Sequence, residues 1–224
     1  MFKHKLQKTA LGEWLIKNLT REDLKRFLKE NRSEKRTLAI DCDDALSSLD
    51  FFPNKVWVGE KQMKGKIDKI VDYYNLPFQD KEFEIVVCTG LLEHVKEPYK
   101  LIQEIKRVLK PGGKIILSAS FVFSLHNVPG HYFYFTPYGI KYLLRDWSEV
   151  NVKSSCGSMK TLAILLQRIC YQSDMFLPVK IFLYLTAKII PYLQFFIKEE
   201  YGDIRKKTKV DSVLGSNVQV VAFK

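Results

Sequence analysis

The stretch NLPFQDKEFEIVVCTGLLEHVKEPYKLIQEIKRVLKPGG, residues 75–113, restricts the fold of this chain more than any other part of the sequence. It opens on turn-forming residues and continues into an apolar, β-branched run at 83–88, which predicts a buried strand. Pro98 suits a first helical turn, and apolar side chains then recur at helical spacing until Pro-Gly-Gly at 111–113 ends the helix. A further strand is expected at 114–117. Because a helical crossover returns the chain to the same sheet, this order predicts parallel strands.

Short apolar runs of the same character on both sides of this stretch predict the other strands. They lie at Thr37–Asp41, Lys55–Val58, Lys69–Val71, Val150–Lys153 and Val218–Phe223, with another helix at Pro137–Leu144. Together the runs predict an α/β fold, a doubly wound and mainly parallel seven-stranded sheet. Such sheets bind ligands outside the carboxyl ends of their strands.

The chain divides into N-terminal helices at 1–36 and an α/β domain at 37–224. Thr20 followed by Asp23 resembles a capping box and predicts a short helix that runs to Lys29. The helices at 1–36 either pack on the core as a cap or form a lid over a site. A helical insertion is expected at about 157–210, before the last strand.

The insertion is dense in large apolar side chains between residues 159 and 198, where Lys180, Lys188 and Pro191 interrupt them. The interruptions indicate a poor transmembrane sequence, because a spanning helix needs about 20 predominantly apolar residues. Two shorter amphipathic helices are expected instead. They can cap the sheet, form a homodimer or lie in a membrane interface, and the sequence leaves these alternatives open.

Basic residues outnumber acidic ones by 36 to 25, which gives a net charge of +11. Nucleic acid, anionic lipid or a phosphorylated substrate would each suit such a chain, and solvated lysine-rich helix faces explain the same charge. Nucleic acid is not expected as a partner, because the sequence shows no added RNA-binding module.

The four cysteines, at positions 42, 88, 156 and 170, have no metal-ligand spacing, so reduced core thiols and no metal site are expected. The first residues lack the unbroken apolar run and the cleavage site of a signal peptide. The sequence therefore predicts a cytoplasmic protein, with peripheral contact at the inner membrane face left open.

Acidic residues stand where three of the predicted strands end, at Asp41, Glu60 and Asp72. In a parallel sheet these ends meet at one edge, where carboxylates can accept hydrogen bonds from ribose hydroxyls or an adenine amino group. The edge therefore has the outline of a nucleoside site.

Three consecutive segments, Asp72–Phe78, Phe83–Val95 and Arg107–Gly113, resemble motifs of the class I S-adenosylmethionine-dependent methyltransferases in order and spacing. The resemblance covers residues 36–152 and implies a Rossmann-like methyltransferase fold, methyl transfer and S-adenosylmethionine as the cofactor. The positions that it assigns to the cofactor are Asp41, Asp43, Glu60, Asp72, Tyr73, Thr89, Glu93 and His94.

The first motif of the family is altered here to Asp41-Cys42-Asp43-Asp44. Relatives have a Gly-x-Gly loop at this point, whose small residues let the backbone approach the cofactor. The two extra carboxylates also bring negative charge towards a site that must accept another carboxylate. At the second strand Glu60 is the expected ribose ligand, with Lys61 in its place under a shifted alignment.

Two functions are compatible with this pattern. One is a methyltransferase acting on a small molecule, a sugar or a lipid-linked glycan. The other is a catalytically silent relative that uses the fold for binding or scaffolding.

The loop SLHNVPGHYFYFT, residues 124–136, resembles the substrate-side loop of a subgroup that modifies surface glycans and lipid-linked sugars. His131 and Tyr134 stand where that subgroup has an acid and an arginine. Transfer to a hydroxyl calls for a base, and His126 and His131 are the candidate catalytic residues. The alternative is that both are loop residues satisfied by backbone or water. His94 is expected to orient the loop through hydrogen bonds.

Overall fold

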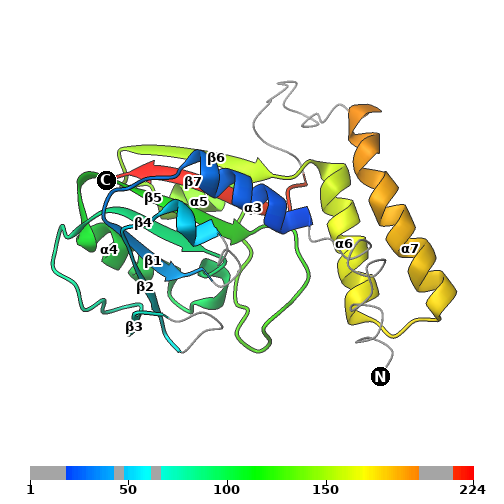
Figure 1. Cartoon of the computed structure of the whole chain (residues 1–224), viewed down its shortest axis with the longest axis horizontal. Coiled ribbons are helices and arrows are strands. Elements are labelled where there is room, and N and C mark those ends of the chain that lie inside the picture. The colour runs from blue at the N-terminus through cyan, green and yellow to red at the C-terminus, as the bar shows by residue number, and fades with distance from the viewer. Residues whose placement is uncertain (1–18, 43–47, 62–66, 197–213) are drawn as a thin grey trace.

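The computed structural model describes residues 19–42, 48–61, 67–196 and 214–224 (Figure 1). In this part of the chain, seven strands form one sheet in the order β3-β2-β1-β4-β5-β7-β6. The strands are β1 (Thr37–Asp41), β2 (Lys55–Gly59), β3 (Lys69–Ile70), β4 (Phe83–Thr89), β5 (Leu109–Ser120), β6 (Glu149–Ser155) and β7 (Asn217–Phe223). Strands β1 to β5 pair in parallel, and β7 is antiparallel to both β5 and β6. The predicted doubly wound, mainly parallel sheet is confirmed.

Helices cover both faces of the sheet because successive strand residues point to opposite sides. The helices are α3 (Leu19–Glu30), η2 (Leu92–His94), α4 (Pro98–Val108), α5 (Pro137–Leu143), α6 (Ser158–Gln172), α7 (Leu177–Ile189) and η3 (Ile190–Phe196). Leu38 and Ile40 of β1 are buried with the apolar side chains of α4 and α5. Ala39 lies in the opposite layer, with residues of α3. Figure 1 shows α3 and α4 on opposite sides of the sheet.

Helix α3 matches the helix predicted from Thr20 to Lys29, and its apolar face is buried. Leu24 and Leu28 point into the core beside Trp57 of β2. This helix is therefore packed on the sheet and is not a free lid. The other helix expected in the first segment lies outside the described residues.

Strand β5 begins earlier than the sequence predicts. Helix α4 ends at Val108 and the strand starts at Leu109, so Pro-Gly-Gly at 111–113 lies inside β5 instead of before it. The register with β4 shifts at this point. Gly113 passes so close to its neighbours that a Cβ atom would lie 2.9 Å from the Lys110 carbonyl oxygen. The glycines thus allow an irregular strand start, where a helix stop was expected.

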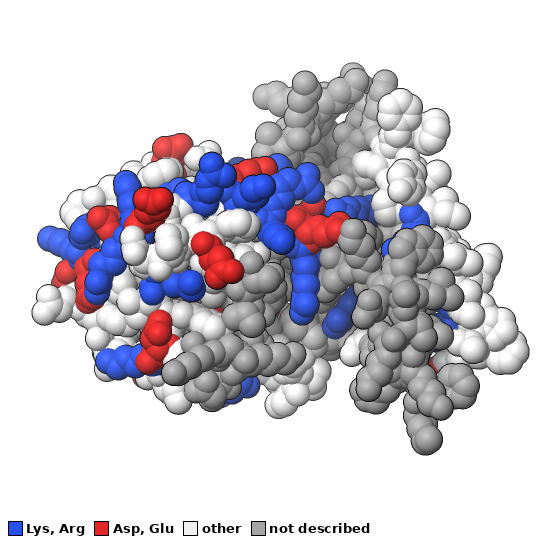
Figure 2. Space-filling view, viewed as in Figure 1, with Lys and Arg blue, Asp and Glu red and all other residues white. Residues whose placement is uncertain are grey.

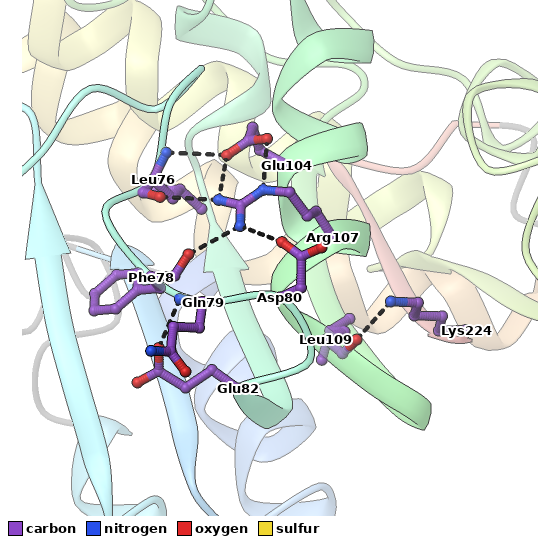
Figure 3. A network of polar contacts seen from close by, with 9 residues as sticks. All are labelled: Leu76, Phe78, Gln79, Asp80, Glu82, Glu104, Arg107, Leu109 and Lys224. Atoms are coloured by element: carbon purple, nitrogen blue, oxygen red, sulfur yellow. Dashed lines mark hydrogen bonds and ion pairs between the residues drawn. The ribbon is translucent and has the colours of Figure 1, made fainter.

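The end of α4 holds the turn before β4 through a single arginine (Figure 3). The Arg107 guanidinium donates to the carbonyl oxygens of Leu76 and Phe78, at 2.9 and 2.8 Å. It also contacts the carboxylates of Asp80 and Glu104, both at 2.8 Å. Two of the resembling motifs, DYYNLPF and RVLKPGG, are therefore joined by this side chain.

The described part of the 157–210 segment forms α6, α7 and η3, which lie beyond one end of the sheet (Figure 1). These three helices do not cap a sheet face. Helix α6 is tied to α3, because Asp23 accepts hydrogen bonds from the Cys156 thiol at 2.8 Å and from Lys160 Nζ at 3.0 Å. Helix α7 packs on α6, and within α7 Tyr184 and Ala187 are the buried residues.

The stretch Leu177–Phe196, 20 residues long, is long and apolar enough to cross a membrane by length and composition alone. By these two criteria, the expectation of a poor transmembrane sequence is wrong.

Candidate functional site

The site lies at the carboxyl edge of the sheet, where β1 and β4 are neighbours. The chain runs outward from β1 to β2 and β3, then returns to place β4 on the other side of β1. This reversal is the point where open α/β sheets bind ligands. Asp41, the last residue of β1, is paired in register with Thr89, the last residue of β4. Thr89 itself is buried.

On one side of this point, Tyr73 connects two of the predicted acidic positions. Its hydroxyl donates to Asp41 Oδ2 at 3.0 Å and accepts a hydrogen bond from the Glu60 backbone N–H at 2.9 Å. Burial and the neighbouring Asp41 charge raise the pKa of Tyr73 well above its ordinary value, so the hydroxyl stays protonated. Glu60 and Asp72 are exposed, and Asp72 Oδ1 accepts from the Tyr74 N–H at 2.8 Å. Asp41, Glu60 and Tyr73 are therefore brought together at this edge of the sheet.

The backbone at the altered glycine motif keeps a conformation that suits glycine. Asp41 and Cys42 both have positive φ, 61° and 65°, in the left-handed region that side chains disfavour. The Cys42 thiol is buried and donates a hydrogen bond to the Ile40 carbonyl at 3.2 Å. Asp43, predicted to bind the cofactor, lies outside the described residues, as does Asp44.

We call the place where the strand order reverses, between the ends of β1 and β4, the switch point. Its other side is built on Glu93. Its side chain is 2% exposed, and Oε1 accepts a hydrogen bond from the Ser120 hydroxyl at 2.7 Å. Its backbone carbonyl accepts from the Tyr132 N–H at 2.8 Å, so the 121–136 loop folds back onto η2. Oε2 is also buried, and it has no hydrogen-bond partner among the described residues.

This loop brings three histidines into contact. His94 of η2 lies with its Nε2 atom 3.2 Å from Nε2 of His126. The rings of His126 and His131 are 4.5 Å apart, and those of His94 and His131 are 5.1 Å apart. His131 in turn packs on Tyr134, with ring centroids 4.7 Å apart. We call these three imidazoles the histidine cluster.

Burial lowers the pKa of His126, and the nearby His94 and His131 lower it further, while the Ser124 carbonyl and Glu93 act in the opposite direction. The neutral imidazole is therefore favoured at this position.

The insertion contributes to the site through a residue that the sequence did not single out. Arg168 of α6 donates from Nε to the Ser124 hydroxyl at 3.0 Å, and its guanidinium stacks 4.9 Å from the Phe123 ring centroid. Gln172 Nε2 donates to the Leu125 carbonyl at 2.9 Å. Helix α6 thus holds the start of the 121–136 loop. No spacing in the sequence indicates these contacts, since they join segments more than forty residues apart.

The resemblance places His94 beside the cofactor, and in the structure His94 contacts His126 and His131. The expectation that it orients the loop by hydrogen bonding agrees with its contact to the Gly130 carbonyl, 2.5 Å from Nδ1.

The chain is similar to known proteins both in sequence and in fold. The family model described as a methyltransferase domain matches residues 28–117. Over these residues the chain is similar to methyltransferase domains. Over all of its length it superposes on a SAM-dependent methyltransferase from Archaeoglobus fulgidus, with a TM-score of 0.58, 16% identity and 98% of that chain covered. A possible histamine N-methyltransferase from Thermotoga maritima gives a TM-score of 0.60 at 15% identity, covering 100% of this chain and 98% of that one.

Curated relatives match shorter segments of the chain. A tRNA U34 carboxymethyltransferase from Nautilia profundicola is 35% identical over 54 residues, 24% of this chain and 18% of the relative. A demethylmenaquinone methyltransferase from Clavibacter sepedonicus is 38% identical over 74 residues, 31% of this chain and 30% of the relative. The chain covers less than half the length of the curated relatives it matches. These matches agree with the Rossmann-like methyltransferase fold implied by residues 72–113.

Proposed function

We propose that the domain is an S-adenosylmethionine-dependent methyltransferase whose cofactor and acceptor bind on opposite sides of the β1–β4 switch point. The proposal rests on one observation, which is that two chemically different groups of side chains stand on the two sides of this point. Acidic groups and Tyr73 stand at the ends of β1 to β3, and histidines and aromatic side chains stand beyond β4 and β5. A nucleoside suits the first group, and a methyl acceptor suits the second.

The residues at the ends of β1 to β3 fit the nucleoside half of the cofactor. The Glu60 and Asp72 side chains are exposed at neighbouring strand ends, where carboxylates can accept hydrogen bonds from hydroxyl and amino groups. Tyr73 fixes the Glu60 backbone relative to Asp41. When bound, the cofactor supplies the electrophilic methyl group, so the protein contributes orientation and removal of water.

The acceptor side is lined by aromatic rings and held on two elements. Tyr132, Phe133 and Tyr134 are each between 38% and 44% exposed, and the loop that carries them is anchored to η2 and α6. Such a surface suits a small acceptor with an apolar body and one polar atom, including a sugar or a lipid-linked glycan. His126 and His131, predicted as catalytic bases, stand within the same loop.

Calorimetric titration of the protein with S-adenosylmethionine and S-adenosylhomocysteine tests the proposal. We expect saturable binding, weakened by Glu60→Ala and by Asp72→Ala, with Glu149→Ala on the far edge strand β6 as a matched carboxylate control. Retention of full affinity in both site variants would contradict the assigned cofactor side. Absence of binding in the wild-type protein would favour the alternative function, a catalytically silent relative used for binding or scaffolding.

We also propose that the insertion attaches the domain to an anionic membrane surface, which is one of the alternatives that the sequence leaves open. Helix α7 and η3 leave large apolar side chains exposed, among them Phe176, Phe182, Tyr192, Phe195 and Phe196. Figure 2 shows few charged residues over α7, whereas Lys and Arg gather over α3, from which α6 separates it. The exposed basic residues of α3 are Arg21, Lys25, Arg26 and Lys29. Exposed apolar and basic side chains on one domain suit attachment to anionic lipid, and a homodimer through α7 is the competing outcome.

A further inference from the structure

Methyl transfer does not require three imidazoles in contact, and the histidine cluster therefore calls for its own explanation. His94, His126 and His131 each offer a ring nitrogen such that the three ligand atoms lie within 4.8 Å of one another. They come from η2 and from two positions of the 121–136 loop, and the cluster contains three of the four histidines of the chain.

The hydrogen bonds of the cluster determine which nitrogens carry hydrogen. Nδ1 faces a backbone carbonyl oxygen in all three rings: Gly130 for His94 at 2.5 Å, Ser124 for His126 at 3.1 Å and His126 for His131 at 3.3 Å. A carbonyl oxygen only accepts, so each Nδ1 is the donor and each neutral ring keeps its lone pair on Nε2. This arrangement, Nδ1–H to carbonyl with Nε2 free, is the one that orients metal-binding histidines.

The lone pairs then meet without a hydrogen between them. Nε2 of His94 and of His126 lie 3.2 Å apart, which is unfavourable for two acceptors unless a cation lies between them. His131 Nε2 is buried and has no partner in the described part of the chain. Two imidazole nitrogens on one tetrahedral Zn²⁺ ion, each about 2.0–2.1 Å from the metal, are separated by about 3.3 Å. The observed separation matches that spacing.

We propose that Nε2 of His94, His126 and His131 binds one divalent transition-metal ion, with Zn²⁺ as the best fit. Neutral imidazole ligands favour zinc and its neighbours over Mg²⁺ or Ca²⁺, which prefer oxygen. Three histidines leave a fourth tetrahedral position open, as in zinc sites that bind water or substrate.

Glu93 supplies the negative charge that such a site needs. Its carboxylate is almost fully buried, with Oε2 unpartnered among the described residues, and it directly precedes His94. A buried carboxylate is costly without a compensating cation, and a metal ion beside it provides one. Ser120 holds the other oxygen, so the carboxylate has a fixed orientation.

A metal at this position would orient an acceptor oxygen and lower its pKa, and would replace the base role of His126 and His131. This consequence rests on the proposed function, whereas metal binding does not. The two are therefore tested separately.

Titration of metal-free protein with Co²⁺, followed by visible absorption, tests the proposal directly. We expect one ion per chain with the intense bands of tetrahedral cobalt, and displacement of the cobalt by Zn²⁺. His94→Asn, His126→Asn and His131→Asn keep a side-chain amide donor near the Nδ1 position and remove Nε2. Each is expected to weaken binding by more than about 100-fold, beyond the loss seen when groups behind the ligands are changed.

Tyr142→Ala is the control variant, because this exposed residue of α5 lies outside both the loop and the histidine cluster. It should bind cobalt like the wild-type protein. Circular dichroism of the metal-free Asn variants shows whether they fold. The proposal is overturned if wild-type protein gives no tetrahedral cobalt spectrum, or if folded Asn variants bind as tightly as the wild type. If the wild-type protein binds cobalt but does not bind S-adenosylmethionine, the proposed function alone is contradicted.

Discussion

The Tyr73 hydroxyl donates a hydrogen bond of 3.0 Å to the Asp41 carboxylate, and this contact joins the end of β1 to the segment that follows β3. The same oxygen accepts the Glu60 N–H at 2.9 Å. One side chain thus fixes the spacing of two acidic positions on the proposed cofactor side. The contact links residues 32 positions apart and depends on the sheet order.

Tyr73→Phe is expected to remove both hydrogen bonds while keeping the ring in the core. Each is worth about 1 kcal/mol, so unfolding in urea should show a loss of about 1–2 kcal/mol. Affinity for S-adenosylmethionine should fall at the same time, because Glu60 loses its fixed backbone position. Tyr74→Phe, which removes a hydroxyl that accepts from the Lys96 and Glu97 backbone, is the matched control for stability. Its cofactor affinity should not change.

Cys42→Gly should be more stable than Cys42→Ala. Both variants lose the buried thiol, but only glycine adopts a φ of 65° without steric cost. The difference in the free energy of unfolding is expected to be about 1 kcal/mol in favour of glycine. Urea denaturation of the two variants side by side provides the measurement. Equal stability would show that the left-handed backbone at Cys42 carries no strain.

Asp23→Asn should weaken the attachment of α6 to α3 in a pH-dependent way. Burial alone would raise the pKa of Asp23, but hydrogen bonds from Cys156 and Lys160 and the charges of Lys160 and Arg26 lower it below its ordinary value of 3.8. Because the pKa is lower in the folded state, the charged Asp23 carboxylate stabilises the fold above its ordinary pKa. This stabilisation is lost as the pH falls through the folded-state pKa.

The wild-type protein should therefore have a higher free energy of unfolding than Asp23→Asn at neutral pH. This difference should shrink in acid, as the pH falls below 3.8. Urea denaturation across this range measures it. Glu149→Gln, which changes an exposed carboxylate on β6, is a suitable comparison. A gap that does not change with pH would contradict the charged role of Asp23.

Arg107→Lys should destabilise the fold, although the positive charge is kept. Lysine cannot reproduce the planar donors that reach Leu76, Phe78, Asp80 and Glu104 (Figure 3). A loss of about 2 kcal/mol is expected, since the lost bonds include charge-assisted ones at a half-buried site. Lys100→Ala breaks an exposed ion pair with Glu97 and should change stability by less than about 1 kcal/mol. If the two substitutions lower stability by similar amounts, the structural role assigned to Arg107 is contradicted.

The strands and the similarity to methyltransferase domains were predictable because both depend on local pattern. The run at Phe83–Cys88 and the motif through Gly113 carry period and composition that a sequence shows directly, and β4 and α4 lie where they were expected. The start of β5 was missed because Pro-Gly-Gly commonly ends a helix. Here it accommodates a register shift against β4 instead, which depends on the neighbouring strand.

The histidine cluster was not predictable in the same way. The sequence placed His94 with the cofactor and His126 and His131 with the acceptor, and it predicted no metal site. Their convergence depends on the course of the 121–136 loop, which hydrogen bonds to the Glu93 backbone and to Arg168 determine. Contacts of this kind join residues without a periodic relation, so spacing gives no indication of them.

Replacing Leu193, Phe195 and Phe196 by Ser should abolish membrane attachment and leave the fold intact. Phe195 is 90% exposed and Phe196 78%, so their removal costs little folded-state packing. Liposomes containing anionic lipid should sediment the wild-type protein, and the triple variant should stay in the supernatant, because the apolar contact supplies most of the binding. Tyr138→Ser with Tyr142→Ser removes exposed aromatics from α5 and should sediment like the wild type. If instead the wild-type protein stays in solution and the triple variant changes from dimer to monomer in light scattering, the exposed face is a homodimer interface and the membrane proposal is wrong.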